Sequence, residues 1–194
     1  MKRWLVLLLL VGGVVWWWHE PEAKWRGMPA AQDPIQTDTH LPRSFNHGEH
    51  TITPLANYSI KAVVLCRKRY RYDAVGDLAP VDLALGWGPM STGGVINAIN
   101  FSQSGRFVEY SWSGEEPLPP DQISCHSANT HCLPATPEIR RQLLAIRRHD
   151  VVTLEGYLVE VTTPGGADPW RSSLVRTDTR GGACEIMWVT AIKR

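Results

Sequence analysis

The pattern of hydrophobic and polar positions is clearest in the last third of the chain, where it predicts one helix. Thr136 is a good N-cap residue, Pro137 suits the first helical position, and Glu138 is favourable in the first turn. Apolar side chains then recur at helical spacing, at Ile139, Leu143 and Ile146. We therefore expect a helix over about 137–148 with one buried face.

Several other stretches alternate between apolar and polar residues or are rich in β-branched side chains, which is typical of strands. These stretches are Tyr58–Cys66, Arg106–Trp112, Val151–Val161, Leu174–Thr177 and Cys184–Ile192. The last two are expected to pair across a turn that contains Gly181 and Gly182. Together with the helix, these strands predict an α+β fold made mainly of antiparallel sheet or a small barrel.

The run from His149 to Val161 resembles the opening strands of small barrels such as OB-folds. The resemblance rests on the pattern of a curved hairpin with a glycine, and it covers only this stretch. It implies a barrel-like arrangement of strands and no particular ligand.

The N-terminus predicts a membrane segment over residues 1–18. Lys2 and Arg3 are followed by Trp4–Trp18, a run without any charged side chain. Positive residues stay in the cytoplasm, so we expect a single-pass protein of the bacterial inner membrane, held through residues 4–18, with its C-terminal domain in the periplasm. The alternative is a signal peptide that is removed, which would release the protein into the periplasm.

Residues 19–57 show no sustained strand or helix pattern and contain five prolines, Pro21, Pro29, Pro34, Pro42 and Pro54. Such a segment is typical of an extended tether that holds a domain away from a membrane. The folded domain is then expected over residues 58–194, which is long enough to bury a core.

Composition excludes some classes of function. The 194 residues include 20 Lys and Arg against 19 Asp and Glu, so the chain lacks the basic excess that nucleic-acid binding needs. No motif for a nucleotide, a kinase reaction or a metalloprotease is present, and we expect no cofactor.

The four cysteines favour disulfides, because an extracytoplasmic domain lies in an oxidising compartment. Three pairings are possible, and the favoured one joins Cys125 to Cys132 and Cys66 to Cys184. A zinc site at Cys125, His126, His131 and Cys132 has the right ligand types but not the usual spacing. A second histidine group, His40, His47 and His50, falls in the expected tether, so we expect no metal.

A nucleophile is the alternative role for Cys184, which follows the permissive glycines Gly181 and Gly182. A histidine base would come from elsewhere in the chain, and the candidates are His131, His126 and His149. Asp178 or Asn129 could orient that ring. Ser173 offers a serine version of the same chemistry, although it lacks a recognised serine-hydrolase motif.

Two tryptophans are expected on loops, where large aromatic side chains make good contact surfaces for a glycan or a protein. Trp87 lies between glycines, and Trp170 follows a segment rich in proline and glycine, with Arg176 close behind it as a further binding candidate. We therefore expect a binding or assembly role in the cell envelope, with a protein or glycan partner. The second hypothesis is an envelope hydrolase or transferase that uses Cys184 or Ser173 with a histidine.

Overall fold

The computed structural model describes residues 24–73, 75–165, 168–176 and 184–194. Within these ranges strands predominate and helices are few and short, which confirms the α+β class. The expected membrane segment lies outside the described residues. Among the described helices, none has the length and hydrophobicity needed to cross a membrane.

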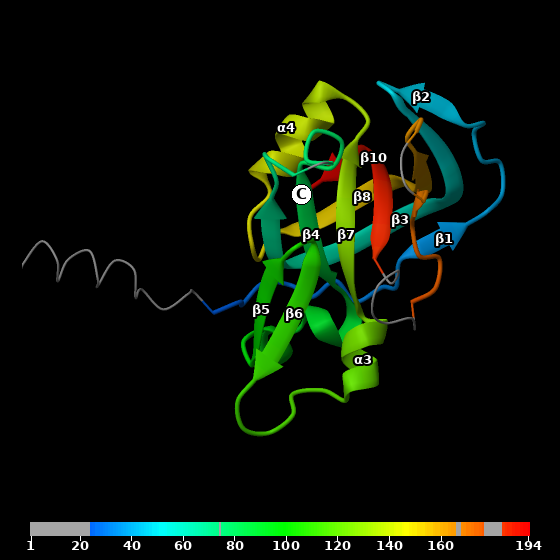
Figure 1. Ribbon diagram of the computed structural model, residues 1–194. Coiled ribbons are helices and arrows are strands. Elements are labelled where there is room, and N and C mark those ends of the chain that lie inside the picture. The colour runs from blue at the N-terminus through cyan, green and yellow to red at the C-terminus, as the bar shows by residue number, and fades with distance from the viewer. Residues whose placement is uncertain (1–23, 74, 166–167, 177–183) are drawn as a thin grey trace, which may run out of the picture.

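Five strands form a ring of paired neighbours. They are β3 (His50–Arg69), β4 (Val81–Gly86), β7 (Ser127–Pro134), β10 (Glu185–Lys193) and β8 (Val151–Thr162). Each pairs with the next in this order, and β8 pairs in turn with β3, so the sheet closes into a small barrel (Figure 1). All of these pairs are antiparallel except β7 with β10, which is parallel. The result is a closed five-stranded barrel. The stretch His149–Val161, which resembles the opening strands of small barrels, corresponds to β8, the fourth of these five strands along the chain.

The length of β3 allows the closure. Its 20 residues pair with β8 over Thr51–Val63 and with β4 over Val63–Arg69, so one strand belongs to both sides of the ring. Pro54 lies inside this strand where the register with β8 shifts, and such an irregularity tolerates a residue without an N–H donor.

The prediction of an extended tether over residues 19–57 is wrong for residues 24–57, the part of this range that the structure describes. Short strands β1 (Ile35–Thr37) and β2 (Phe45–His47) both pair with β3, which itself begins at His50. Ala30 and Ile52 are also buried in the core. The chain from residue 24 onward therefore belongs to the folded domain.

The predicted helix is α4 (Pro137–Ala145), and it closes one end of the barrel (Figure 1). The Thr136 hydroxyl accepts a hydrogen bond of 3.2 Å from the backbone N–H of Ile139, as expected of an N-cap. Leu143 and Ile146 are fully buried among the side chains of the barrel interior. The helix ends before residue 148, because Ile146 has already taken an extended backbone conformation.

A long insertion between β4 and β7 covers the outer face of β3 and β4. It contains η1 (Gly88–Ser91), α2 (Gly93–Ile96), β5 (Ile99–Ser104), β6 (Phe107–Trp112) and α3 (Pro120–Cys125). Met90, Ile96 and Ile123 of the insertion pack against Leu65 on β3. The hairpin of β5 and β6 confirms the strand expected at Arg106–Trp112, apart from Arg106, which lies in the turn.

The other two strand predictions near the C-terminus have different outcomes. Cys184–Ile192 corresponds closely to β10. By contrast, residues 174–176 are not in a strand, and the local strand is β9 (Trp170–Arg171), which pairs with β8. Gly181 and Gly182 lie outside the described residues.

Candidate functional site

A row of polar side chains crosses the outer face of the barrel on three neighbouring strands. Asp82 on β4 is paired with His131 on β7, and Glu185 at the start of β10 is paired with Thr130. Cys184 therefore lies beside Asn129. Side chains alternate between the two faces of a strand. Asp82, His131 and Cys184 therefore share the outer face, while the residues before and after each of them along its own strand face the barrel interior.

Asp82 and His131 form a buried pair. Asp82 Oδ2 lies 2.9 Å from His131 Nδ1, and the two side chains are 0% and 4% exposed. The other carboxylate oxygen, Oδ1, accepts a hydrogen bond of 2.9 Å from the Arg106 guanidinium. Contacts on both oxygens fix the orientation of the carboxylate, and this carboxylate in turn fixes the imidazole ring.

The electrostatic environment keeps His131 protonated at neutral pH. Burial on its own would lower the pKa of the ring, but its contacts with Asp82 and Cys184, together with the charges of these two groups, raise it to about 9. The side chain is therefore an imidazolium at pH 7. It places a positive charge next to the Cys184 sulfur.

Cys184 is only partly buried, unlike the other two members of the row. Its Sγ accepts a hydrogen bond of 3.4 Å from the Asn129 side-chain amide. The same amide donates a 2.7 Å hydrogen bond to the carbonyl oxygen of Arg106, and its oxygen accepts one of 2.8 Å from Gln103. Asn129 thus ties the sulfur to the β5–β6 hairpin.

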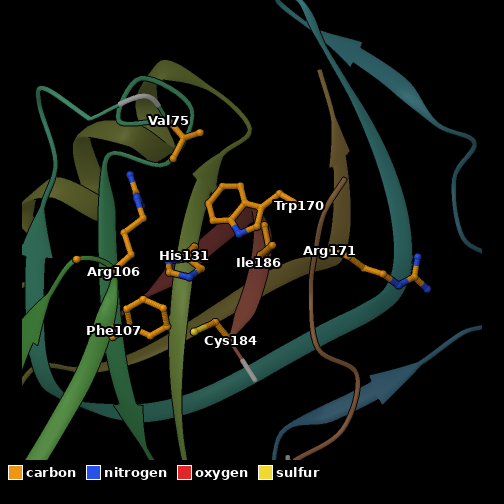
Figure 2. Close-up of a pocket in the computed structure, with 9 residues that line it drawn as sticks. Val75, Arg106, Phe107, His131, Trp170, Arg171, Cys184 and Ile186 are labelled. Atoms are coloured by element: carbon orange, nitrogen blue, oxygen red, sulfur yellow. The ribbon is translucent and has the colours of Figure 1, made fainter. Parts of the chain in front are cut away.

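A pocket of about 420 Å³ opens over this row, and its lining includes both Cys184 and His131. The remaining lining residues are Val75, Gly105, Arg106, Phe107, Trp170, Arg171 and Ile186. Figure 2 shows the His131 ring between Phe107 on one side and Trp170 on the other, with Cys184 directly below it. The Trp170 ring centroid is 5.0 Å from that of His131. A pocket of this size can hold a small organic group next to the sulfur.

Arg106 reaches the site from the tip of the β5–β6 hairpin. Gly105 and Arg106 form a two-residue turn with positive φ angles of 55° and 68°, the geometry of a tight hairpin. The guanidinium lies 4.0 Å from the centroid of the Tyr70 ring and also contacts Asp73 at 2.7 Å. An arginine at such a φ is uncommon, and these contacts hold it there.

The structure brings together two of the four catalytic candidates from the sequence. Cys184 and His131 meet at the pocket. Ser173 lies beside Cys184, because its backbone N–H donates a 3.0 Å hydrogen bond to the Cys184 carbonyl, but its buried hydroxyl donates a 2.9 Å hydrogen bond to the Val175 carbonyl and does not line the pocket. Asp178 lies outside the described residues. The other two histidine candidates face different partners: His126 contacts the Gln122 carbonyl, and His149 packs against Trp25.

The expected disulfides differ from the structure, in which all four cysteines are free thiols. Cys132 lies well along strand β7, about 17 Å from Ser127 at about 3.3 Å per residue, so it cannot reach Cys125 at the end of α3. Cys66 on β3 is three strand spacings from Cys184, or about 14 Å. Neither distance is compatible with a bridge.

Of the three residues expected to bind a partner, Trp87, Trp170 and Arg176, only Trp170 lies at the pocket. Trp87 is 1% exposed in the core, and its indole N–H donates a 3.0 Å hydrogen bond to Asp33, so it cannot contact a partner. Trp170 does line the pocket. Arg176 is held away from it by a hydrogen bond to the Pro34 carbonyl and by contact with Tyr58.

Two residues of the site, Asp82 and Arg106, are not among the candidates that the sequence indicates. Asp82 is the one charged residue in the apolar run Ala79–Leu85, and a lone charge inside a buried strand is a signal of function. Arg106 follows Gly105 in a hairpin turn, but nothing in the sequence indicates that its side chain reaches back to β4.

The described residues contain no group of three or more His, Cys, Asp or Glu side chains arranged to hold a metal ion. The site consists instead of a thiol, an imidazole and a carboxylate that lie next to one another on neighbouring strands of the barrel surface. Comparison with protein-family models, curated proteins and solved structures found no match for this chain.

Proposed function

We propose that this protein is a thiol-dependent hydrolase or acyltransferase in which Cys184 is the nucleophile. The observation that carries the proposal is the contiguous row of Cys184, His131 and Asp82 at the edge of a pocket. A nucleophile, a base and a group that orients the base are the three parts needed for covalent acyl transfer. Each part of the row matches one of these roles.

The chemistry would proceed in two steps. The thiolate of Cys184 attacks the carbonyl carbon of an ester, thioester or amide, and the bond to the leaving group breaks as that group takes a proton from His131. The acyl group is now a thioester on Cys184. Water or an acceptor hydroxyl or amine then attacks the thioester, and His131 takes the proton of that attacking group. The C–S bond breaks, the acid or transferred acyl product leaves, and the Cys184 thiolate and the His131 imidazolium are restored.

Asp82 would act by positioning. Its contact with His131 Nδ1 directs the other ring nitrogen away from β4, and its charge stabilises the imidazolium that each step requires. Arg106 holds the second oxygen of the carboxylate, so it acts on the reaction through Asp82 and not by touching the nucleophile.

The place of action that we propose is the cell envelope. Its support is the sequence pattern of residues 1–18, in which a basic N-terminus precedes an apolar run. On this proposal the domain lies in the bacterial periplasm, either anchored in the inner membrane or released after cleavage of a signal peptide.

The test compares the reactivity of two cysteines in one protein. Cys184 and Cys125 are both partly exposed, and Cys184 has the imidazolium of His131 beside it. We expect chloroacetamide to alkylate Cys184 at least about tenfold faster than Cys125 at pH 7, as followed by peptide mass spectrometry on the full chain. Cys184→Ala should abolish hydrolysis of p-nitrophenyl acetate, and Cys125→Ala should leave it intact. Equal alkylation rates for the two thiols would refute the proposal.

A second candidate function is the binding or assembly role, with an envelope protein or glycan as the partner. It is favoured by aromatic side chains on the β5–β6 hairpin, where Phe107 and Tyr110 are 55% and 39% exposed and Tyr110 stacks on Trp112. If this role holds, Tyr110→Ala should weaken binding to isolated envelope material while Cys184→Ala binds normally. Unchanged binding by Tyr110→Ala would remove this candidate.

A further inference from the structure

The walls of the pocket next to Cys184 are mainly apolar. Phe107 and Trp170 flank the His131 ring, and Val75 and Ile186 also contribute to the lining (Figure 2). Phe107 keeps 55% of its surface exposed, although it lies at the rim of a cavity. An aromatic side chain that is exposed at such a position can gain apolar contact when a ligand enters.

The charged residues of the lining are already neutralised. The Arg106 guanidinium pairs with Asp82 at 2.9 Å and with Asp73 at 2.7 Å. Arg171 pairs with Glu160 at 2.7 Å, and Figure 2 shows its side chain directed away from the pocket. Neither arginine is free to bind a carboxylate or a phosphate of a substrate, because either ligand would have to displace an existing ion pair.

From these two observations we infer that the pocket accepts an uncharged aromatic or branched apolar group bonded close to the reacting carbon. This inference rests on the proposed function, since it names the class of acyl donor that Cys184 would attack. Substrates with a charged group at that position would place the charge against Phe107 and Trp170. The charged side chains nearby are already paired, and this includes His131, which is held by Asp82, so none of them is available to replace the lost hydration.

The test uses three chloroacetamides on the full-length protein: the parent compound, its N-benzyl derivative and its N-carboxymethyl derivative. In each case the Cys184 thiolate forms a C–S bond, the C–Cl bond breaks and chloride leaves. Labelling of Cys125 corrects for the intrinsic reactivity of each compound. We expect the corrected rate at Cys184 to be about tenfold higher for the N-benzyl compound than for the parent, and no higher for the anionic one.

Variants on the hairpin locate the effect. Phe107→Ala should remove most of the preference for the N-benzyl compound, and Tyr110→Ala, an exposed aromatic on the same hairpin that does not line the pocket, should retain it. Equal corrected rates for the three compounds, or a preference for the anionic one, would overturn this inference while leaving the proposed function intact. Slow labelling of Cys184 by every compound would overturn both.

Discussion

Replacement of Asp82 by asparagine should remove the pH dependence of stability that His131 confers. The pKa of His131 is raised to about 9 in the folded protein, against about 6.5 in an unfolded chain. A raised pKa contributes stability that is fully present below pH 6.5 and is lost as pH rises through 9. The difference between the two values corresponds to about 3 kcal/mol.

In Asp82→Asn the largest favourable contact of the imidazolium is gone, and burial of the ring then dominates. We expect the pKa of His131 to fall toward or below its ordinary value of about 6.5. At pH 6 the variant should be less stable than the wild type by about 3 kcal/mol, since one member of a buried ion pair has been removed. At pH 10, where the wild type has lost the imidazolium, the difference should shrink to the part that comes from the lost contact between Asp82 and Arg106.

The assay is urea unfolding of both proteins at pH 6 and pH 10, followed by circular dichroism. Asp121→Asn serves as the control, because Asp121 is an exposed carboxylate on α3 and its replacement should leave the wild-type pH dependence unchanged. Groups that lie far from Asp82 and His131 titrate equally in all three proteins and cancel in the comparison. The reasoning is refuted if Asp82→Asn loses as much stability as the wild type between the two pH values.

Three further predictions follow from the fold. Gly156→Ala should destabilise the barrel by at least about 3 kcal/mol in urea unfolding, because a Cβ there would lie 1.9 Å from the Trp188 carbonyl oxygen. Thr136→Ala should cost about 1 kcal/mol through loss of the helix cap, and Thr136→Ser should restore it. Without reductant, Cys66 and Cys132 should resist alkylation in the folded protein, since burial raises the pKa of both thiols, and should react in urea, where a bridged pair would not.

Features set by neighbouring residues could be predicted from the sequence. The cap at Thr136 and the spacing of Leu143 and Ile146 identified helix α4, and alternation identified β8 and β10 within a few residues. Local patterns succeed here because capping bonds and side-chain alternation depend on residues close in the chain.

The sequence predicts a domain that starts at residue 58, whereas the folded domain includes the chain from residue 24, and this difference has a specific cause. Prolines between residues 19 and 57 suggested irregular structure, yet Pro54 is accommodated at a register shift within β3. An alternation of buried positions does run through this part, at Ile52, Pro54, Ala56 and Tyr58. Proline removes a donor without breaking a strand when it lies at a bulge, and the position of a bulge depends on the pairing with a second strand, which one segment alone does not show.

The loop around Trp87 shows a different error, because a side chain expected to be exposed is buried in the core. Its flanking glycines and proline correctly indicated a break in the strand, but they did not indicate where the indole would point. The hydrogen bond to Asp33 and the packing in the core come from segments distant in sequence. Glycine and proline positions therefore predict a turn better than they predict whether a side chain in that turn is exposed.

Two incompatible roles for Cys184 follow from the sequence, and strand order excludes one of them, the disulfide. An even number of cysteines favours a bridge to Cys66, whereas the glycines before Cys184 suggest a nucleophile that takes its histidine base from elsewhere in the chain. In the barrel, β4 and β7 lie between Cys66 and Cys184 and keep them apart. These same two strands carry Asp82 and His131. The strands that separate Cys184 from its expected disulfide partner are therefore the ones that supply its imidazole and carboxylate.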